Sequence, residues 1–188
     1  MHRRESVAAG AGALASGTIG ERVTSGANAG RRKFYARIEA LRALATQMNA
    51  RLFINARTDT YCVAHDDRVA GYQDTARRAQ LYAAAGADGI FVPGMDVEDV
   101  FPFARLAVLP LNVYAGGGWA PPVHLLRRAG VRRISLGCGP LQSVFGSLRR
   151  IASEAFAYGT YTTMSSNMLP VSDVNELFLT PEPSHQKG

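Results

Sequence analysis

The apolar residues of the chain fall into short continuous runs separated by stretches with helical spacing. A short apolar run with Gly or Pro close by predicts a buried strand. Such runs occupy 52–59 (LFINARTD), 89–93 (GIFVP), 110–115 (PLNVYA) and 131–137 (VRRISLG). Between them, 67–85, 96–107 and 121–129 repeat apolar residues at helical intervals. Strict alternation of strand and helix predicts an α/β fold with a parallel sheet and right-handed crossovers.

Glycines mark the predicted joints between helix and strand. Gly86 and Gly130 each stand just past a helical stretch, where a left-handed cap costs glycine least. Two further stretches, 33–46 and 141–158, also repeat apolar residues at helical spacing. They predict a helix before the first of these strands and a long helix after the last.

The run 52–59 ends in a charged tip. Its last residues are Arg57, Thr58 and Asp59, carried by an apolar stem. Ligands of parallel α/β folds bind at the carboxyl ends of the strands, so this tip predicts an anion-binding site. Alternation along a strand turns Arg57 and Asp59 to one face, together with Asn55. The alternative is that Arg57 and Asp59 pair with neighbouring loops and have no ligand.

Four motifs, in this order and spacing, carry a family resemblance: LFINARTD, AAAGADGIFVPG, PLNV and LLRRAGVRRISLG. They resemble the second half of the isocitrate lyase and phosphoenolpyruvate mutase superfamily. The likeness is greatest to its short members, the carboxyvinyl-carboxyphosphonate phosphorylmutase and methylisocitrate lyase-like proteins. The resemblance covers roughly residues 37–160 and implies a partial (β/α)8 TIM barrel, strands five to eight with their helices. It also implies an enzyme that acts on small 2-oxo acids or phosphonates through a Mg²⁺-stabilised enolate.

The resemblance assigns expected roles to several residues. Arg57 matches the family arginine that binds the carboxylate or phosphonate of the substrate, a task suited to its planar fork. Asp59 is expected to orient Arg57 or to touch the metal shell through water, or else to serve as a structural partner of the next helix. Asn112 and Tyr114 are expected to face the substrate, as Asn55 is. His65 is a candidate general acid or base, although a lone loop histidine is more often only solvated.

Two glycine-rich turns follow the last two predicted strands. In many barrels such turns bind phosphate through backbone N–H groups, which makes Gly117, Gly137 and Gly139 candidate anion-binding residues. Plain turns are also rich in glycine, and we favour that interpretation. Cys138 lies near a predicted helix start and is interpreted as a small packing residue.

Other family motifs are missing from this sequence. The Asp-x-Asp and Glu-Asp pairs that hold Mg²⁺, and the loop with Lys-Cys-Gly-His, do not occur before Leu52. Mg²⁺ is therefore expected for the family while its ligands are missing here. Pro93 stands where methylisocitrate lyases carry a Glu, which argues against that substrate. A catalytically inactive remnant that binds small anions through Arg57 is the alternative to an active lyase or mutase.

The composition predicts three segments. Residues 1–32 are rich in Gly, Ala and Ser and predict a flexible or degenerate amino-terminal segment, in which 11–18 is a remnant or mimic of the region of strand four. The alternative for this segment is a transit peptide. Residues 33–164 form the expected half of a barrel, and 165–188 a tail or short docking helix. A truncated or frame-shifted gene product would explain this arrangement.

Charge and cysteine content narrow the classes of function. The chain has 188 residues and a formal charge of +6, but no base-reading motif, so nucleic-acid binding is a weak alternative. No apolar run approaches the ~18 residues of a membrane span. The two cysteines, Cys62 and Cys138, have neither disulfide nor metal spacing and fit a reducing cytoplasm. The resemblance further implies a homo-oligomer, because the last helices of the superfamily are often exchanged between subunits.

Overall fold

The computed structural model describes residues 15–21, 28–62, 67–118 and 120–179. The chain divides into two compact units, Met1–Gly139 and Pro140–Gly188, and each unit is described by itself. His65, the candidate acid or base, lies outside the described residues.

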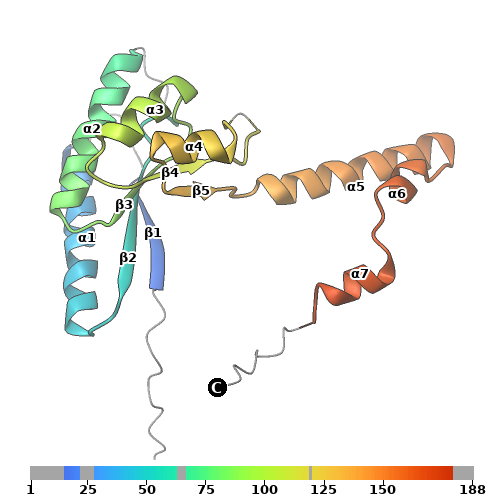
Figure 1. Cartoon of the computed structure of the whole chain (residues 1–188), viewed down its shortest axis with the longest axis horizontal. Helices are drawn as coiled ribbons and strands as arrows, with labels where there is room; N and C mark the ends of the chain where they lie inside the picture. Colours follow the sequence, from blue (N-terminus) through green and yellow to red (C-terminus); the bar gives the residue numbers. More distant parts are fainter. Residues whose placement is uncertain (1–14, 22–27, 63–66, 119, 180–188) are drawn as a thin grey trace, which may run out of the picture. The chain divides into compact units, whose positions relative to one another are not determined.

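The first unit is built on one parallel sheet. Its strands are β1 (Ala15–Glu21), β2 (Leu52–Thr58), β3 (Gly89–Val92), β4 (Leu111–Tyr114) and β5 (Arg133–Ser135). They lie side by side in the order β1-β2-β3-β4-β5, and every neighbouring pair is parallel (Figure 1). The predicted α/β fold with a parallel sheet is therefore confirmed.

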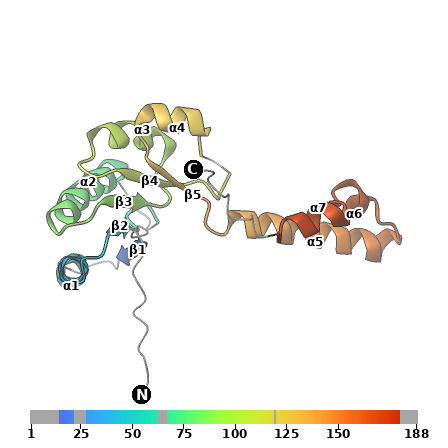
Figure 2. The same ribbon diagram turned by 60° about the horizontal axis from the view of Figure 1, so that its bottom comes forward.

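Helices connect the strands and cover one face of the sheet (Figures 1 and 2). They are α1 (Asn28–Gln47), α2 (Arg68–Ala84), α3 (Val97–Leu106) and α4 (Val123–Ala129). Asp67 caps α2, because its side chain accepts a hydrogen bond from the backbone N–H of Val69 at 2.8 Å. Gly86 and Gly130, with φ of 96° and 100°, adopt the left-handed conformation that the sequence predicts at these helix ends.

The hydrophobic core lies between this face of the sheet and the helices. Alternate strand residues point into it, among them Ile54, Ile90 and Val113, which are almost fully buried. Tyr82 and Phe103 meet them from the helices. Burying each such side chain contributes roughly 1.5–3 kcal/mol to folding. The opposite face of the sheet carries the polar residues of the strands, because neighbouring side chains alternate between the two faces.

Strand β1 lies within the segment whose composition predicts flexibility. Ala15–Glu21 pairs with the whole of β2, from Ala15 opposite Leu52 to Glu21 opposite Thr58. The sequence ASGTIGE has few apolar side chains, so its strand conformation comes mainly from backbone hydrogen bonds to β2. For these residues the prediction of a flexible segment is corrected, while the rest of the proposed division into segments stays a prediction.

Arg42 of α1 joins the helix to the amino ends of β2 and β3. Its guanidinium donates to the carbonyl oxygen of Leu52 at 3.1 Å and to that of Gly86 at 2.9 and 3.0 Å. It also pairs with the carboxylate of Asp88, which accepts the backbone N–H of Ile54 at 2.7 Å. All three nitrogens of this guanidinium are bound to the protein, which makes the cluster a structural clamp.

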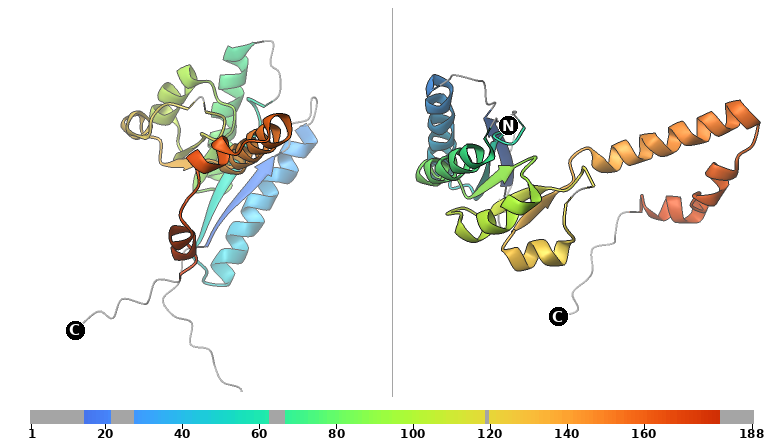
Figure 3. Two further views of the ribbon diagram at one scale, coloured as in Figure 1. Left: turned by 90° about the vertical axis from the view of Figure 1, so that its right-hand side faces the viewer. Right: turned by 90° about the horizontal axis from the view of Figure 1, so that it is seen from above.

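The second unit consists of three helices. They are α5 (Gly139–Tyr158), α6 (Thr162–Ser166) and α7 (Val171–Glu176), one long helix followed by two short ones (Figure 3). Glu154 joins α5 to α6, because it accepts hydrogen bonds from Thr160 and from the backbone N–H groups of Thr162 and Thr163. Hydrogen bonds from Thr163 and Thr160 lower the pKa of Glu154 to about 2. The predicted helix at 141–158 is confirmed.

None of the residues of these three helices is buried. Large apolar side chains are exposed along them, among them Phe145, Leu148, Phe156 and Val171. Within the described parts of the chain, no helix combines the length and apolarity that crossing a membrane requires.

Candidate anion-binding site

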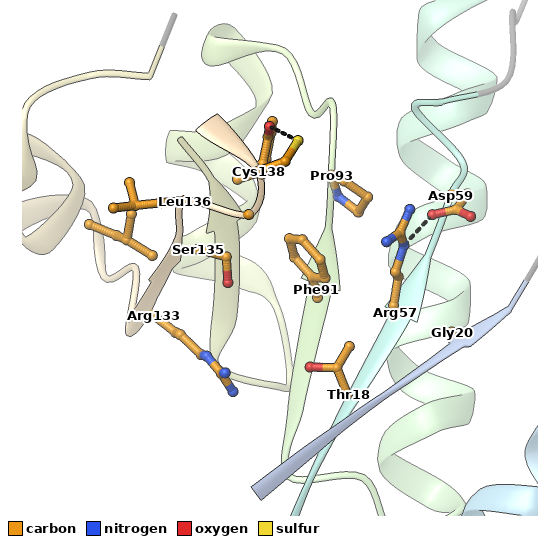
Figure 4. Close-up of a pocket in the computed structure, with 13 residues that line it drawn as sticks. Thr18, Gly20, Arg57, Asp59, Phe91, Pro93, Arg133, Ser135, Leu136 and Cys138 are labelled. Atoms are coloured by element: carbon orange, nitrogen blue, oxygen red, sulfur yellow. Dashed lines mark hydrogen bonds and ion pairs between the residues drawn. The ribbon is translucent and has the colours of Figure 1, made fainter. Parts of the chain in front are cut away.

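A cavity of about 1120 Å³ lies on the polar face of the sheet (Figure 4). All five strands, or the turns that follow them, contribute to its wall. The lining residues are Thr18, Gly20, Arg57, Asp59, Phe91, Pro93, Tyr114, Arg133, Ile134, Ser135, Leu136, Gly137 and Cys138. Residues from the first to the last strand therefore line one cavity. This agrees with the expectation that the carboxyl ends of parallel strands surround a common site.

Arg57 and Asp59 lie together in this cavity. The Nε of Arg57 donates to Oδ1 of Asp59 at 2.6 Å, and the guanidinium carbon lies 5.6 Å from the centroid of the Phe91 ring (Figure 4). The two terminal nitrogens of Arg57 form no hydrogen bond with any residue that the structure describes. The side chain is 40% exposed, so these nitrogens are accessible to a ligand. Asp59 fixes one edge of the guanidinium while the other edge is available.

Asn55 lies on the same face of β2 but does not line the cavity. Its side chain is buried, and its Nδ2 donates to Oγ1 of Thr18 at 3.2 Å. Because the Thr18 hydroxyl accepts this bond, its own proton is available to a group in the cavity. Thr18 was not among the candidate site residues, because 11–18 was interpreted only as a remnant or mimic of the region of strand four in a segment of flexible composition.

Asn112 and Tyr114 belong to β4, on the face of the sheet that carries the cavity. Asn112 is buried, and its Oδ1 accepts a hydrogen bond from the Ser135 hydroxyl at 3.0 Å. Its Nδ2 is buried without a hydrogen-bond partner among the described residues. Tyr114 lines the cavity, with its hydroxyl 3.9 Å from the sulfur of Cys138. The hydrogen bond with Cys138 raises the pKa of Tyr114, so this phenol stays protonated and able to donate.

The two glycine-rich turns pack against each other. A Cβ at Gly116 would lie 2.0 Å from the carbonyl oxygen of Leu136, and one at Gly139 would lie 2.6 Å from that of Gly116. Gly137 lines the cavity with a φ of 54°, whereas Gly117 is exposed and does not line it. Glycine is thus needed at Gly116 and Gly139 for close packing, which fits the favoured interpretation as turns. Anion binding by Gly117, Gly137 and Gly139 stays a prediction.

The two cysteines are free and exposed. Cys138 lines the cavity, so its interpretation as a packing residue is corrected. The sulfur of Cys62 donates to the carbonyl oxygen of Pro93 at 3.5 Å. Burial raises the pKa of Cys62, and Asp59 raises it further, so this thiol is not activated.

Tyr61, in the loop after β2, and Arg68, at the start of α2, both donate hydrogen bonds to Asp99 of α3. The Tyr61 hydroxyl donates to Oδ2 of Asp99 at 2.8 Å, and Nη2 of Arg68 donates to Oδ1 of Asp99 at 2.7 Å. The bond from Arg68 lowers the pKa of Asp99, while burial, chiefly, raises that of Tyr61. This network ties the chain beyond Asp59 to the start of α3.

The described residues show no cluster of Mg²⁺ ligands. They contain no group of three or more His, Cys, Asp or Glu side chains that could hold a metal ion. Asp59 is the carboxylate in the cavity wall, and it is already paired with Arg57. Mg²⁺ usually keeps several waters and binds through one or two carboxylates, so it stays an expectation from the family, and we assign none of the described residues to it.

Comparisons with known proteins identify the family. Residues 7–156 match the family model of phosphoenolpyruvate phosphomutase. The chain is 32% identical to a phosphonomutase, provisionally assigned, from Burkholderia cenocepacia J2315, covering 76% of this chain and 60% of that protein with a TM-score of 0.65. It is 27% identical to a provisionally assigned lyase/mutase of the same organism, covering 89% and 60% with a TM-score of 0.75.

A further relative is an uncharacterized protein of Mycobacterium tuberculosis, 36% identical over 96 residues, which are 50% of this chain and 35% of the relative. The chain belongs to the phosphoenolpyruvate phosphomutase family, and the resemblance to the phosphoenolpyruvate mutase and isocitrate lyase superfamily is confirmed. It spans 60% of the length of the two Burkholderia structures and about a third of the mycobacterial relative.

Proposed function

We propose that this protein acts on a small 2-oxo acid or phosphonate whose anionic group is bound by Arg57, as part of a reaction that makes or breaks a C–C or P–C bond. Family membership supports a lyase or mutase. In this proposal β2 to β5 correspond to strands five to eight of a barrel. One observation carries the binding site: Arg57 is held by Asp59 and presents its terminal nitrogens to the cavity.

The described residues account for the binding step. The two terminal nitrogens of Arg57 match the two oxygens of a carboxylate, or two of a phosphonate, through parallel charge-assisted hydrogen bonds. Asp59 keeps the guanidinium plane in one orientation, and the Phe91 ring lies on one side of it. The hydroxyls of Thr18 and Tyr114 line the same cavity and are neutral donors. An enolate would need Mg²⁺ in the family pattern, but we attribute no step of this chain to a metal.

The first alternative is a catalytically inactive remnant that binds small anions through Arg57. The lack of a carboxylate cluster among the described residues favours it. Both hypotheses place the anion at the same arginine, and they differ in whether Mg²⁺ changes the bound state. A nucleic-acid-binding module is the less favoured alternative and depends on the +6 charge alone. It would require affinity for nucleic acid that falls steeply with salt.

We also propose that the protein is a homo-oligomer. Phe145, Leu148 and Phe156 of α5 are exposed, and a soluble helix rarely leaves so many large apolar side chains in water. Light scattering on a size-exclusion column tests this directly. A single monomer peak at all concentrations would contradict it.

The test of function is thermal unfolding with oxalate, Mg²⁺, both together, and neither. Oxalate resembles the enolate of pyruvate. An unfolding midpoint temperature that rises only with both ligands supports an active site assembled with Mg²⁺, because a ligand that binds the folded state raises its stability. A midpoint that rises with oxalate alone supports the inactive remnant that binds anions. A midpoint that changes with neither ligand contradicts the proposed site.

A further inference from the structure

We infer that a basic hollow at the amino ends of the strands binds an oligophosphate, at a site separate from the cavity around Arg57. The hollow has a volume of about 390 Å³ and lies between the last turns of α3 and α4 and the starts of β4 and β5. Its lining combines three arginines with apolar residues, among them Arg105, Arg128 and Arg132 with Val108, Leu109 and Pro110. None of these residues lines the cavity at the carboxyl ends.

The three arginines come from three segments that are packed together. Arg105 lies in the last turn of α3, Arg128 in the last turn of α4, and Arg132 directly before β5. The end of α4 contacts α3 so closely that a Cβ at Gly130 would lie 3.3 Å from a backbone carbonyl oxygen of α3. The backbone N–H of Arg132 donates to the carbonyl oxygen of Leu111 at 3.1 Å. The backbone therefore holds the three arginines in fixed positions around the hollow.

These arginines have no partner in the described protein. None of the three guanidinium groups forms a hydrogen bond or an ion pair with a residue that the structure describes. The described lining contains no Asp or Glu. Attraction to the negative ends of two helices accounts in part for Arg105 and Arg128, but Arg132 belongs to no helix. The donors of all three side chains are therefore available to a ligand.

Three positive charges around one hollow favour an anion with several charged groups. Like charges with no carboxylate among them repel one another, and a bound polyanion removes that repulsion. The planar guanidinium binds phosphate oxygens through parallel charge-assisted hydrogen bonds. A chain of three phosphates offers one anionic group to each arginine. Oxalate has two such groups and leaves one arginine without an anionic partner.

The size and the apolar part of the hollow favour a small ligand. Its volume falls within the roughly 300–1,000 Å³ of small-molecule sites. Val108 is 57% exposed and Pro110 is also exposed, so a ring attached to the phosphates would cover apolar surface. A nucleic acid is bound through longer rows of basic residues than three around one hollow. Free oligophosphate and the phosphate chain of a nucleotide share this chemistry, and affinity distinguishes them.

The test is titration calorimetry in metal-free, low-salt buffer with phosphate, tripolyphosphate and ATP. We expect tripolyphosphate to bind at least about tenfold more tightly than phosphate. Arg105→Gln, Arg128→Gln and Arg132→Gln should each weaken tripolyphosphate binding about tenfold, the loss of one charge-assisted contact. Arg127→Gln is the matched control, because it removes the same charge from an exposed neighbouring position of α4 that does not line the hollow.

Thermal unfolding without ligand first confirms that the variants are folded, as we expect for exposed side chains. Tripolyphosphate that binds no more tightly than phosphate overturns the inference. An Arg127→Gln loss equal to that of the other three variants overturns it too, because general surface charge would then explain the binding. Loss of tripolyphosphate binding in Arg57→Gln also overturns it, since the phosphates would then lie in the cavity.

The remaining arms identify the source of the phosphates. ATP that binds more tightly than tripolyphosphate supports a nucleotide whose ring packs on the apolar lining, and ATP that does not supports free oligophosphate. A single-stranded oligonucleotide that binds more tightly than both, and loses affinity in the same three variants, overturns the choice of a small ligand. Oxalate binding at Arg57 should be unchanged in Arg132→Gln, so this inference and the proposed function succeed or fail separately.

Discussion

Two arginine–aspartate pairs lie at opposite ends of the sheet, and they differ in how fully the protein uses the arginine. At the amino ends of the strands, all three nitrogens of the Arg42 guanidinium bind the protein, at Leu52, Gly86 and Asp88. At the carboxyl ends, Arg57 uses Nε alone, for Asp59. The exposed fractions of the two arginine side chains are similar, 32% and 40%. Hydrogen bonding, and not exposure, distinguishes the structural pair from the pair at the proposed anion site.

This contrast follows the general division of labour in parallel α/β folds. The amino ends of the strands are closed by contacts that stabilise the fold, and the carboxyl ends are where ligands bind. An arginine whose donors are all satisfied holds its neighbours in place. An arginine fixed along one edge, with the other edge in a cavity, is prepared for a planar anion.

The largest expected effect on stability comes from Arg42→Gln. The substitution removes a charged donor from two carbonyl oxygens and from Asp88. We expect the free energy of unfolding to fall by about 2 kcal/mol, a value reduced for the partial exposure of the pair. Urea unfolding measures the loss. Oxalate affinity should stay the same, and a parallel fall in affinity would show that the two ends are not independent.

A smaller effect, which differs between two variants, is expected at Asp59. Asp59→Ala removes the hydrogen bond that orients Arg57 and should weaken oxalate binding about tenfold, since a bond to a charged group contributes roughly 1.5–3 kcal/mol. Asp59→Asn keeps an oxygen for Nε and removes the repulsion of a bound anion, about 0.7 kcal/mol at roughly 6 Å in water. Its affinity should stay equal or rise about threefold at low salt.

Calorimetry on both variants measures these effects. Equal losses in Asp59→Ala and Asp59→Asn would show that the charge of Asp59, and not its orientation of Arg57, matters for binding.

The smallest expected effect concerns the pH dependence of stability at Asp99. The hydrogen bond from Arg68 lowers the pKa of Asp99 in the folded protein. A lowered folded pKa contributes stability above the unfolded pKa of about 3.9, and this contribution is lost as the pH falls through the folded pKa. The difference in unfolding free energy between the wild type and Asp99→Asn should therefore be constant above about pH 5 and shrink below about pH 4. A difference that does not change with pH would contradict this role.

The sequence predicted the main elements of the sheet because apolar strand residues alternate with amphipathic helices. The apolar side chains of Ile54, Ile90 and Val113 are stable only in a buried layer. Gly86 and Gly130 indicated where two of the helices end. Strand β1 was expected only as a remnant or mimic of the region of strand four at 11–18, for the opposite reason. Ala15–Glu21 contributes few apolar side chains, and its pairing with β2 depends on backbone hydrogen bonds that composition does not reveal.

The site was predictable only in part. Arg57, Asp59 and Tyr114 were expected at the cavity because they stand at strand ends, and the structure places them in its wall. Asn55 and Asn112 lie on the expected face, but each is buried and bound to a neighbouring strand. Register across neighbouring strands determines which polar residue reaches the surface, and one sequence alone does not specify register.

Titration calorimetry with oxalate on the wild type, Arg57→Gln and Arg132→Gln tests the central claim most directly. The three proteins should have similar unfolding free energies, because neither arginine holds a structural contact like that of Arg42. We predict that Arg57→Gln binds oxalate roughly 100-fold more weakly, since a charged group in contact with the ligand is lost. Arg132→Gln should bind as the wild type does. Equal affinity in all three proteins would contradict the assignment of the anion site to Arg57.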